Sequence, residues 1–232
     1  MQSTWTKTRN YIIDLVYPKE CVGCNKEGVW LCRRCRSKII KIKTPYCPKC
    51  KRITKNGQFC SNCRKNISLT GIIISAYYRE PLKETIHHYK YQGIRDLKNQ
   101  LSDFIIDRLK NNLPRGEKIL VPIPLYKRKE LERGFNQSRE IAKKISSYFN
   151  IPLTENLLVR KKQTLPQINL RLKERSENIK DAFGLLPGRE IKGKTILLVD
   201  DVTTSGATLN EAAKVLRQAE AKEIWGVVIA QG

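Results

Sequence analysis

Two adjacent carboxylates, Asp200 and Asp201, follow a short apolar run and precede a turn rich in hydroxyl groups. The apolar run, 196–199, is typical of a strand buried on both faces of a parallel sheet. A helix expected over 208–219 would direct its first backbone N–H groups and its positive dipole end at the turn, which favours a phosphate monoester. The carboxylates would accept hydrogen bonds from the sugar of the same ligand. The residues expected to hold the phosphate are Thr203, Thr204, Ser205, Gly206, Ala207 and Thr208.

A second group of candidate ligands consists of eight cysteines, spaced as four Cys-x-x-Cys pairs near the N-terminal end of the sequence. Two such pairs supply the four thiolates of a tetrahedral zinc site, so two closed, structural zinc sites are expected. Pairing in sequence order combines Cys21, Cys24, Cys32 and Cys35 in one site and Cys47, Cys50, Cys60 and Cys63 in the other. A cross-braced arrangement, in which the first pair joins the third, is the alternative. Disulfides and a redox centre are disfavoured, because no secretion signal is present and four pairs exceed the needs of one redox centre.

Cationic side chains follow a second expected strand, 118–123, where they would suit a pyrophosphate group. The candidates are Lys127, Arg128 and Arg133. Arginine favours bidentate phosphate contacts and lysine provides a mobile point charge, whereas a solvated face is the alternative for each residue. Arg171 and Arg175 lie in the polar segment 161–181, which is expected either to close over a ligand or to form a surface helix.

The two histidines, His87 and His88, have no cysteine or carboxylate pattern beside them that would suit a metal. They are therefore expected to be surface or packing residues. Lys90, in the same stretch, is the better candidate for a functional role.

The formal net charge is +23, and residues 1–70 contain 16 Lys and Arg against 3 Asp and Glu. This excess favours polyanionic partners. Basic side chains interspersed with Trp30, Tyr46 and Phe59 would suit single-stranded DNA through phosphate contacts and base stacking; alternatively, the rings form a small core and the cations a solvated face. No apolar run is long enough to span a membrane and residues 1–10 lack the apolar core of a signal peptide, so a cytoplasmic protein is expected.

The elements that must position these groups alternate between strands and helices after residue 70. This alternation predicts an α/β fold with a parallel sheet flanked by helices and with ligands at the carboxyl ends of the strands. The expected strands are 71–78, 118–123, 154–160, 195–199 and 224–230. The expected helices are 81–91, 95–112, 136–149 and 208–219. Ahead of them, 1–18 is expected to form an amphipathic helix that packs on the larger domain, although a partner or membrane surface would suit the same apolar face.

The segment 196–208 resembles the phosphoribosyl pyrophosphate motif of type I phosphoribosyltransferases, in which an apolar strand, two acidic residues and a Thr-Thr/Ser-Gly-x-Thr turn follow one another. Over residues 10–231, the chain also resembles the ComF family. The motifs that carry this resemblance are the four cysteine pairs, His-x-x-Lys-Tyr-x-Gly at 87–93, Val-Pro-Ile-Pro at 121–124, Glu-Arg-Gly-Phe-Asn-Gln at 132–137, Thr-x-Pro-Gln at 164–167 and Glu-Arg-x-x-Asn at 174–178. One departure is Thr203, which replaces a common Leu and adds a hydroxyl group.

The resemblance implies a double zinc ribbon over 19–68 and a type I phosphoribosyltransferase-like domain over 69–232. It also implies binding of phosphoribosyl pyrophosphate with Mg²⁺, with Asp200 and Asp201 as catalytic residues and 203–208 as the 5′-phosphate site. The family's role in natural transformation implies single-stranded DNA and proteins of the DNA-uptake machinery as partners.

Two functional hypotheses follow. The first is transfer of the phosphoribosyl group to an acceptor that the sequence does not identify. The second is a non-catalytic, single-stranded DNA-binding competence factor that senses phosphoribosyl pyrophosphate in the same pocket. The sequence predicts no oligomeric state.

Overall fold

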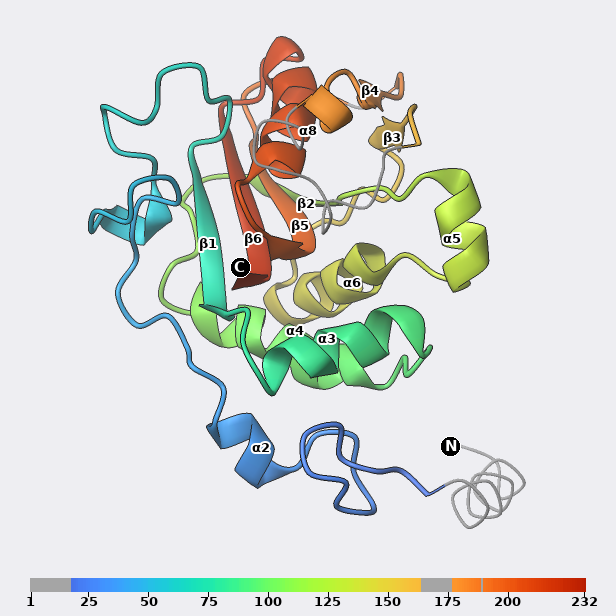
Figure 1. Ribbon diagram of the computed structural model, residues 1–232. Helices are drawn as coiled ribbons and strands as arrows, with labels where there is room; N and C mark the ends of the chain where they lie inside the picture. The colour runs from blue at the N-terminus through green and yellow to red at the C-terminus, as the bar shows by residue number, and fades with distance from the viewer. Residues whose placement is uncertain (1–17, 164–176, 189) are drawn as a thin grey trace.

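A four-stranded parallel sheet forms the centre of the protein in the computed structural model, which describes residues 18–163, 177–188 and 190–232 (Figure 1). Its strands are β1 (Gly71–Tyr77), β2 (Lys118–Pro122), β5 (Thr195–Thr203) and β6 (Glu223–Gln231), in the order β1-β6-β5-β2. Nearly all of their residues are buried, as a sheet covered on both faces requires. The central strands β5 and β6 end side by side, with Thr203 opposite Gln231.

Helices cover both faces of this sheet, which confirms the expected α/β class (Figure 1). One face carries α3 (Leu82–Tyr91), α4 (Leu97–Leu109) and α6 (Gln137–Phe149), and the other carries α8 (Ala207–Gln218). Side chains alternate along a strand, so Leu197 and Val199 belong to the core under the first three helices, whereas Ile196 and Leu198 belong to the core under α8. The sheet thus separates two apolar cores.

Three shorter elements complete the larger domain, namely α5 (Lys127–Arg133) and an antiparallel pair of strands, β3 (Leu158–Arg160) and β4 (Phe183–Leu185). The sequence patterns indicated neither α5 nor β4. The prediction of a strand over 154–160 is wrong for its first half, because β3 begins only at Leu158. Instead of extending β3, the chain at Leu153 forms a bridge to Leu120 on the edge of β2 and then turns away.

The strand expected over 195–199 is too short, because β5 continues to Thr203. Ladder contacts with β6 continue past the apolar run, where Asp200 lies opposite Val228 and Val202 opposite Ala230. The acidic pair therefore belongs to the end of a strand rather than to a turn. Its two carboxylates are held by the sheet before the chain bends.

The cysteine-rich segment covers the outer edge of β1. The backbone N–H of Ile42 donates to the carbonyl of Ser75 at 2.9 Å, and that of Tyr77 donates to the carbonyl of Ile40 at 3.0 Å. An edge strand with unpaired backbone groups is a site for unwanted association, and these contacts occupy it. Helix α2 (Arg33–Ser37) precedes the contact and the short 3-10 turn η1 (Lys55–Gly57) follows it.

The two halves of the cysteine-rich segment pack into different cores. Leu31 and Ile39 join the core under α3 and α4, whereas Ile42 and Phe59 join the core on the α8 side. The helix expected over 1–18 lies outside the described residues except for its last one. The domain limits at 19–68 and 69–232 stay a prediction.

Candidate functional site

The acidic pair at the end of β5 meets a lysine from helix α3. Lys90 Nζ lies 2.7 Å from Asp201 Oδ2, and both side chains are largely buried. Helix α3 is held in position by Tyr89, whose buried hydroxyl donates to the carbonyl of Gln137 at 3.2 Å. The ion pair therefore joins α3 to the carboxyl end of the central strand β5.

Asp200 faces the first turn of α6. Ser138 Oγ donates to Asp200 Oδ1 at 2.9 Å, and the backbone N–H of Asp201 donates to the same oxygen at 2.9 Å. Asn136 caps α6 by accepting from the backbone N–H groups of Ser138 and Arg139, and its amide donates to the carbonyl of Ile123 after β2. A negative charge is stabilised at this end of a helix, so α6 supports the Asp200 carboxylate.

The charges of the acidic pair are not equivalent. Burial and the neighbouring charge of Asp201 raise the pKa of Asp200 to about 7, although Lys90 and Ser138 oppose the rise. Burial would lower the pKa of Lys90, but the charges of Asp201 and Asp200 outweigh it and raise that pKa. Lys90 thus pairs directly with Asp201, and its charge also acts on Asp200.

The turn after β5 leads directly into α8. Gly206 has a φ of +79° and is the residue before α8, and a Cβ atom there would lie 3.2 Å from Ile72 Cδ1. Ser205 Oγ accepts weakly from the backbone N–H of Ala207 at 3.4 Å. Thr203 differs from the expectation, because it is part of β5 and buried. The remaining expected phosphate-binding residues, Thr204, Ser205, Gly206, Ala207 and Thr208, lie together at the N-terminal end of α8.

The cations expected to bind pyrophosphate lie in different surroundings. Lys127 and Arg128 are exposed on α5, and Arg128 pairs with Glu132 at 2.9 Å. Arg133 is half-buried, donates to Gln137 and stacks over the Tyr91 ring at 5.2 Å. The other two candidates, Arg171 and Arg175, lie outside the described residues.

Two cations that the sequence patterns did not indicate share the electrostatic environment of the acidic pair. Burial lowers the pKa of Lys129, and the charges of Arg133, Arg160 and Lys90 lower it further, while Asp201 opposes this effect. Burial also lowers the pKa of Arg160, and Asp200 opposes that shift. Lys129 and Arg133 are four residues apart on α5, so a helical reading of 127–133 would have placed them on one face.

The eight cysteines form two clusters in sequence order. The sulfur atoms of Cys21, Cys24, Cys32 and Cys35 lie within 4.8 Å of one another, and so do those of Cys47, Cys50, Cys60 and Cys63. Hydrogen bonding from the backbone N–H of Cys35 lowers the pKa of Cys32 to about 6, despite desolvation. Four convergent thiols fit a structural zinc site, and the cross-braced alternative does not fit these positions.

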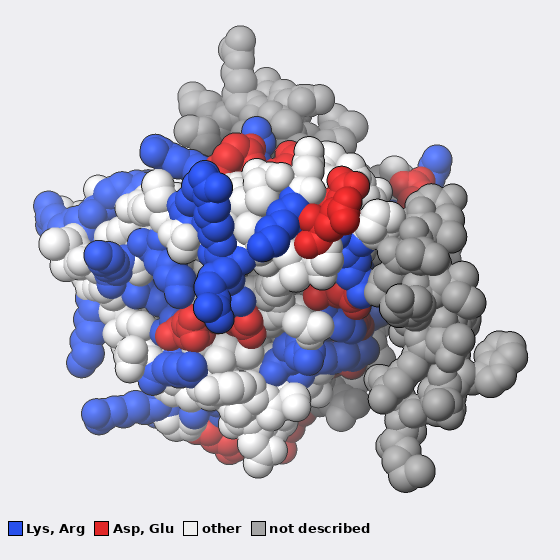
Figure 2. Space-filling view, turned by 90° about the horizontal axis from the view of Figure 1, so that it is seen from below, with Lys and Arg blue, Asp and Glu red and all other residues white. Residues whose placement is uncertain are grey.

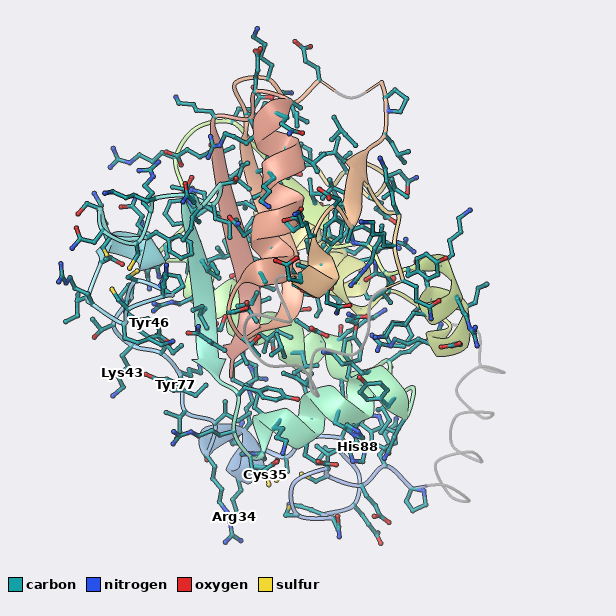
Figure 3. All side chains as sticks on the ribbon, turned by 45° about the horizontal axis from the view of Figure 1, so that its top comes forward. Arg34, Cys35, Lys43, Tyr46, Tyr77 and His88 are labelled. Atoms are coloured by element: carbon teal, nitrogen blue, oxygen red, sulfur yellow. The ribbon has the colours of Figure 1, made fainter. Side chains whose placement is uncertain are left out.

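Exposed basic side chains lie beside the first of these clusters. Arg33, Arg34 and Lys38 are exposed on and after α2, and Figure 2 shows Lys and Arg outnumbering Asp and Glu over the face of the protein seen from below. Arg34 and Lys43 extend away from the ribbon (Figure 3). Tyr46 and Phe59 are only 9% and 8% exposed, so these two rings belong to the core, and base stacking on them is not available.

The histidines take part in local contacts of α3. His88 Nε2 lies 3.0 Å from Glu84 Oε1, one helical turn away, and the His87 ring packs on Tyr91. Both contacts suit residues at the helix surface. Among the helices of the described residues, none has the length and apolar character that crossing a membrane requires.

Two parts of the chain match known protein families. Residues 12–64 match the double zinc ribbon domain and residues 136–232 match the phosphoribosyl transferase domain. Competence protein F of Haemophilus influenzae is 34% identical over 89% of this chain and 95% of that protein. Competence protein ComFC of Bacillus subtilis is 32% identical over 80% of this chain and 77% of that protein. DNA utilization protein YhgH of Escherichia coli is 29% identical over 91% of this chain and 97% of that protein.

Proposed function

The chain belongs to the competence protein F (ComF) family, and from that premise we propose that it binds phosphoribosyl pyrophosphate with Mg²⁺ at the carboxyl end of β5. The observation that carries the proposal is the acidic pair at the end of β5, held by Lys90 and Ser138 beside the N-terminal end of α8. A phosphate group is favoured at the start of a helix, and carboxylates are favoured acceptors for ribose hydroxyl groups. One ligand that contains both groups fits both features.

The acidic pair would act on the sugar. Asp200 and Asp201 would accept hydrogen bonds from the ribose hydroxyl groups, and their negative charge would stabilise the positive charge that develops at the ribose carbon during phosphoribosyl transfer. Lys90 holds Asp201 in orientation through their 2.7 Å contact. Carboxylate oxygens are ligands that suit Mg²⁺, which would supply charge neutralisation of the departing pyrophosphate.

The pyrophosphate would be bound by cations near the acidic pair. Lys129 and Arg133 belong to α5, Arg160 belongs to β3, and all three have the appropriate charge. Burial lowers the pKa values of Lys129 and Arg160, and for Lys129 the positive charges of Arg133, Arg160 and Lys90 add to the effect. A polyanionic leaving group would relieve this repulsion.

Titration calorimetry with phosphoribosyl pyrophosphate and Mg²⁺ tests the binding site. The double variant Asp200→Asn plus Asp201→Asn should abolish binding, whereas Asp107→Asn, an exposed carboxylate on α4, should leave the affinity unchanged. Unchanged affinity in the double variant would overturn the proposed site. Release of pyrophosphate in the presence of bases, amines or single-stranded DNA then separates a transferase from a protein that only binds the ligand.

A second candidate function, single-stranded DNA binding, is favoured by the charge of the cysteine-rich segment. The names of the relatives, competence protein and DNA utilization protein, support a role in DNA uptake together with uptake-machinery proteins. Exposed Arg33, Arg34 and Lys38 would contact phosphates, and such contacts make the affinity depend on salt.

Fluorescence anisotropy with a labelled thymidine oligonucleotide at several salt concentrations tests this candidate. Replacing Arg33, Arg34 and Lys38 by Gln should weaken binding and reduce its salt dependence. The matched control replaces three other exposed cations, Lys143, Lys144 and Lys192, by Gln. Equal loss in both triple variants, or binding that is insensitive to salt, would contradict a DNA site at α2.

A further inference from the structure

Gln231, at the end of β6, joins the second cysteine cluster to the turn after β5. The Oε1 atom of Gln231 accepts from the hydroxyl of Tyr46 at 3.0 Å and from Lys51 Nζ at 2.6 Å. These two donors flank the pair Cys47 and Cys50. Its Nε2 atom donates to the carbonyl of Thr204 at 3.2 Å and, more weakly, to that of Pro48 at 3.4 Å.

The contact occupies both halves of the side-chain amide. Gln231 is 6% exposed. If its amide were removed, the partners of the amide would therefore lose hydrogen bonds that water could not fully replace. The side-chain amide has a carbonyl oxygen that can accept from two donors and an NH₂ group that can donate to two carbonyls. Among the side chains, only an amide combines these two abilities. Tyr46 lies near Tyr77, the last residue of β1, and its hydroxyl acts as a donor to Gln231 (Figure 3).

The same contact sets the orientation of the turn. The carbonyl of one residue and the N–H of the next lie in one rigid peptide plane and point in opposite directions. Gln231 holds the carbonyl of Thr204, and the backbone N–H of Gly232 holds that of Thr203 at 3.0 Å. The N–H groups of Thr204 and Ser205 are therefore directed away from β6. Successive N–H groups with a common direction form an anion-binding concavity.

We propose that Gln231 is a positioning residue that orients the phosphate-binding turn against the second cysteine cluster. This inference rests on the proposed function and adds to it a physical link between the cysteine-rich segment and the ligand site. Thr204 supplies the contact on the turn side, and Tyr46, Pro48 and Lys51 supply it on the cysteine side. Disturbing either side reduces the order of the turn and so weakens the binding of a phosphate.

The test uses ribose 5-phosphate as the probe, because it reports on the phosphate-binding turn without a pyrophosphate group. Titration calorimetry on the full chain compares wild type with Gln231→Met, a neutral change of similar length. We expect about 5- to 30-fold weaker binding, the loss that corresponds to one or two buried hydrogen bonds. Tyr46→Phe, which removes a single hydroxyl, should weaken binding in the same direction by a smaller factor.

Asp103→Asn serves as the matched control. It removes the negative charge from the 3.0 Å ion pair between Arg36 and Asp103, which also joins the cysteine-rich segment to the larger domain but lies at α4. The control should leave the affinity unchanged. Zinc content and thermal unfolding temperature are measured for every variant, since a purely structural role of Gln231 would change these and not the affinity.

Three outcomes separate the inference from the function on which it rests. Weaker binding by Gln231→Met and Tyr46→Phe, together with non-additive effects in the double variant, supports the positioning role. Wild-type affinity in both single variants would overturn the role of Gln231 and leave the proposed ligand site intact. Absence of binding by the wild-type protein to both ribose 5-phosphate and phosphoribosyl pyrophosphate would overturn both.

Discussion

Lys90 and Asp201 form a buried ion pair of 2.7 Å that joins helix α3 to the carboxyl end of β5. The two residues are far apart in the sequence, and the pair places a single positive charge beside two carboxylates. A buried charge that loses its partner is costly, because it keeps the desolvation penalty without the compensating attraction. The stability of the protein and the charge state of the ligand site are therefore linked through this contact.

Replacing Lys90 by Met should lower the free energy of unfolding at pH 7 by about 3–5 kcal/mol, the usual cost of removing one partner of a buried pair. Chemical denaturation measures this loss. The matched variant Lys83→Met lies on the same helix and removes only an exposed contact of 3.8 Å with Glu80, so its effect should stay below about 1 kcal/mol. Similar small effects in both variants would show that the pair does not hold α3 in place.

Asp200→Asn should stabilise the protein at alkaline pH. The pKa of Asp200 is raised to about 7 in the folded protein, above its ordinary value of 3.8. The protonated Asp200 side chain therefore contributes fully to the free energy of unfolding below about pH 4. This contribution is lost as the pH rises through 7, because the folded state then releases a proton that the unfolded state has already lost.

Urea unfolding of wild type and Asp200→Asn at pH 5 and pH 8 measures this effect. We expect the variant to gain about 1–4 kcal/mol relative to wild type at pH 8, as a shift of up to three units implies, and less at pH 5. Asn keeps an oxygen that accepts from Ser138. A variant that is less stable than wild type at pH 8 would show that Asp200 is ionised without penalty.

Gly206→Ala should weaken the binding of ribose 5-phosphate as well as the fold. The residue has a φ of +79°, and the added methyl group would meet Ile72 at 3.2 Å. Gly193→Ala is the control, because Gly193 also has a positive φ but has open space around it. Each change should cost about 1–2 kcal/mol of stability, measured by denaturation. Calorimetry should show a loss of affinity of about 10-fold or more for Gly206→Ala alone, and equal affinities would place the phosphate elsewhere.

The zinc stoichiometry distinguishes the two pairings of the cysteines. We expect two zinc ions per chain by elemental mass spectrometry. The double variant Cys24→Ser plus Cys32→Ser changes one cluster and should retain one zinc, whereas Cys24→Ser plus Cys50→Ser changes both clusters and should retain none. Under cross-braced pairing, these two results would be exchanged.

The sequence by itself determined the elements whose signals are local. The apolar runs of β1, β2, β5 and β6 and the spacing within each Cys-x-x-Cys pair depend on residues close together in the chain, so their character could be predicted. The start of α8 and the glycine before it followed for the same reason. The end of β5 did not, because ladder pairing with β6 extends the strand through polar residues that no apolar pattern marks.

The tertiary structure decided which of these local features meet. The strand order β1-β6-β5-β2 brings Gln231 beside Thr203 and the edge strand β1 beside the cysteine-rich segment, and no local pattern states that order. Three further features depend on the tertiary structure. They are the pairing of Lys90 with Asp201, the closeness of Lys129 and Arg160 to the acidic pair, and the grouping of the cysteines. The physical reason is that burial and charge pairing act between segments that are distant in sequence, whereas propensity and spacing act within them.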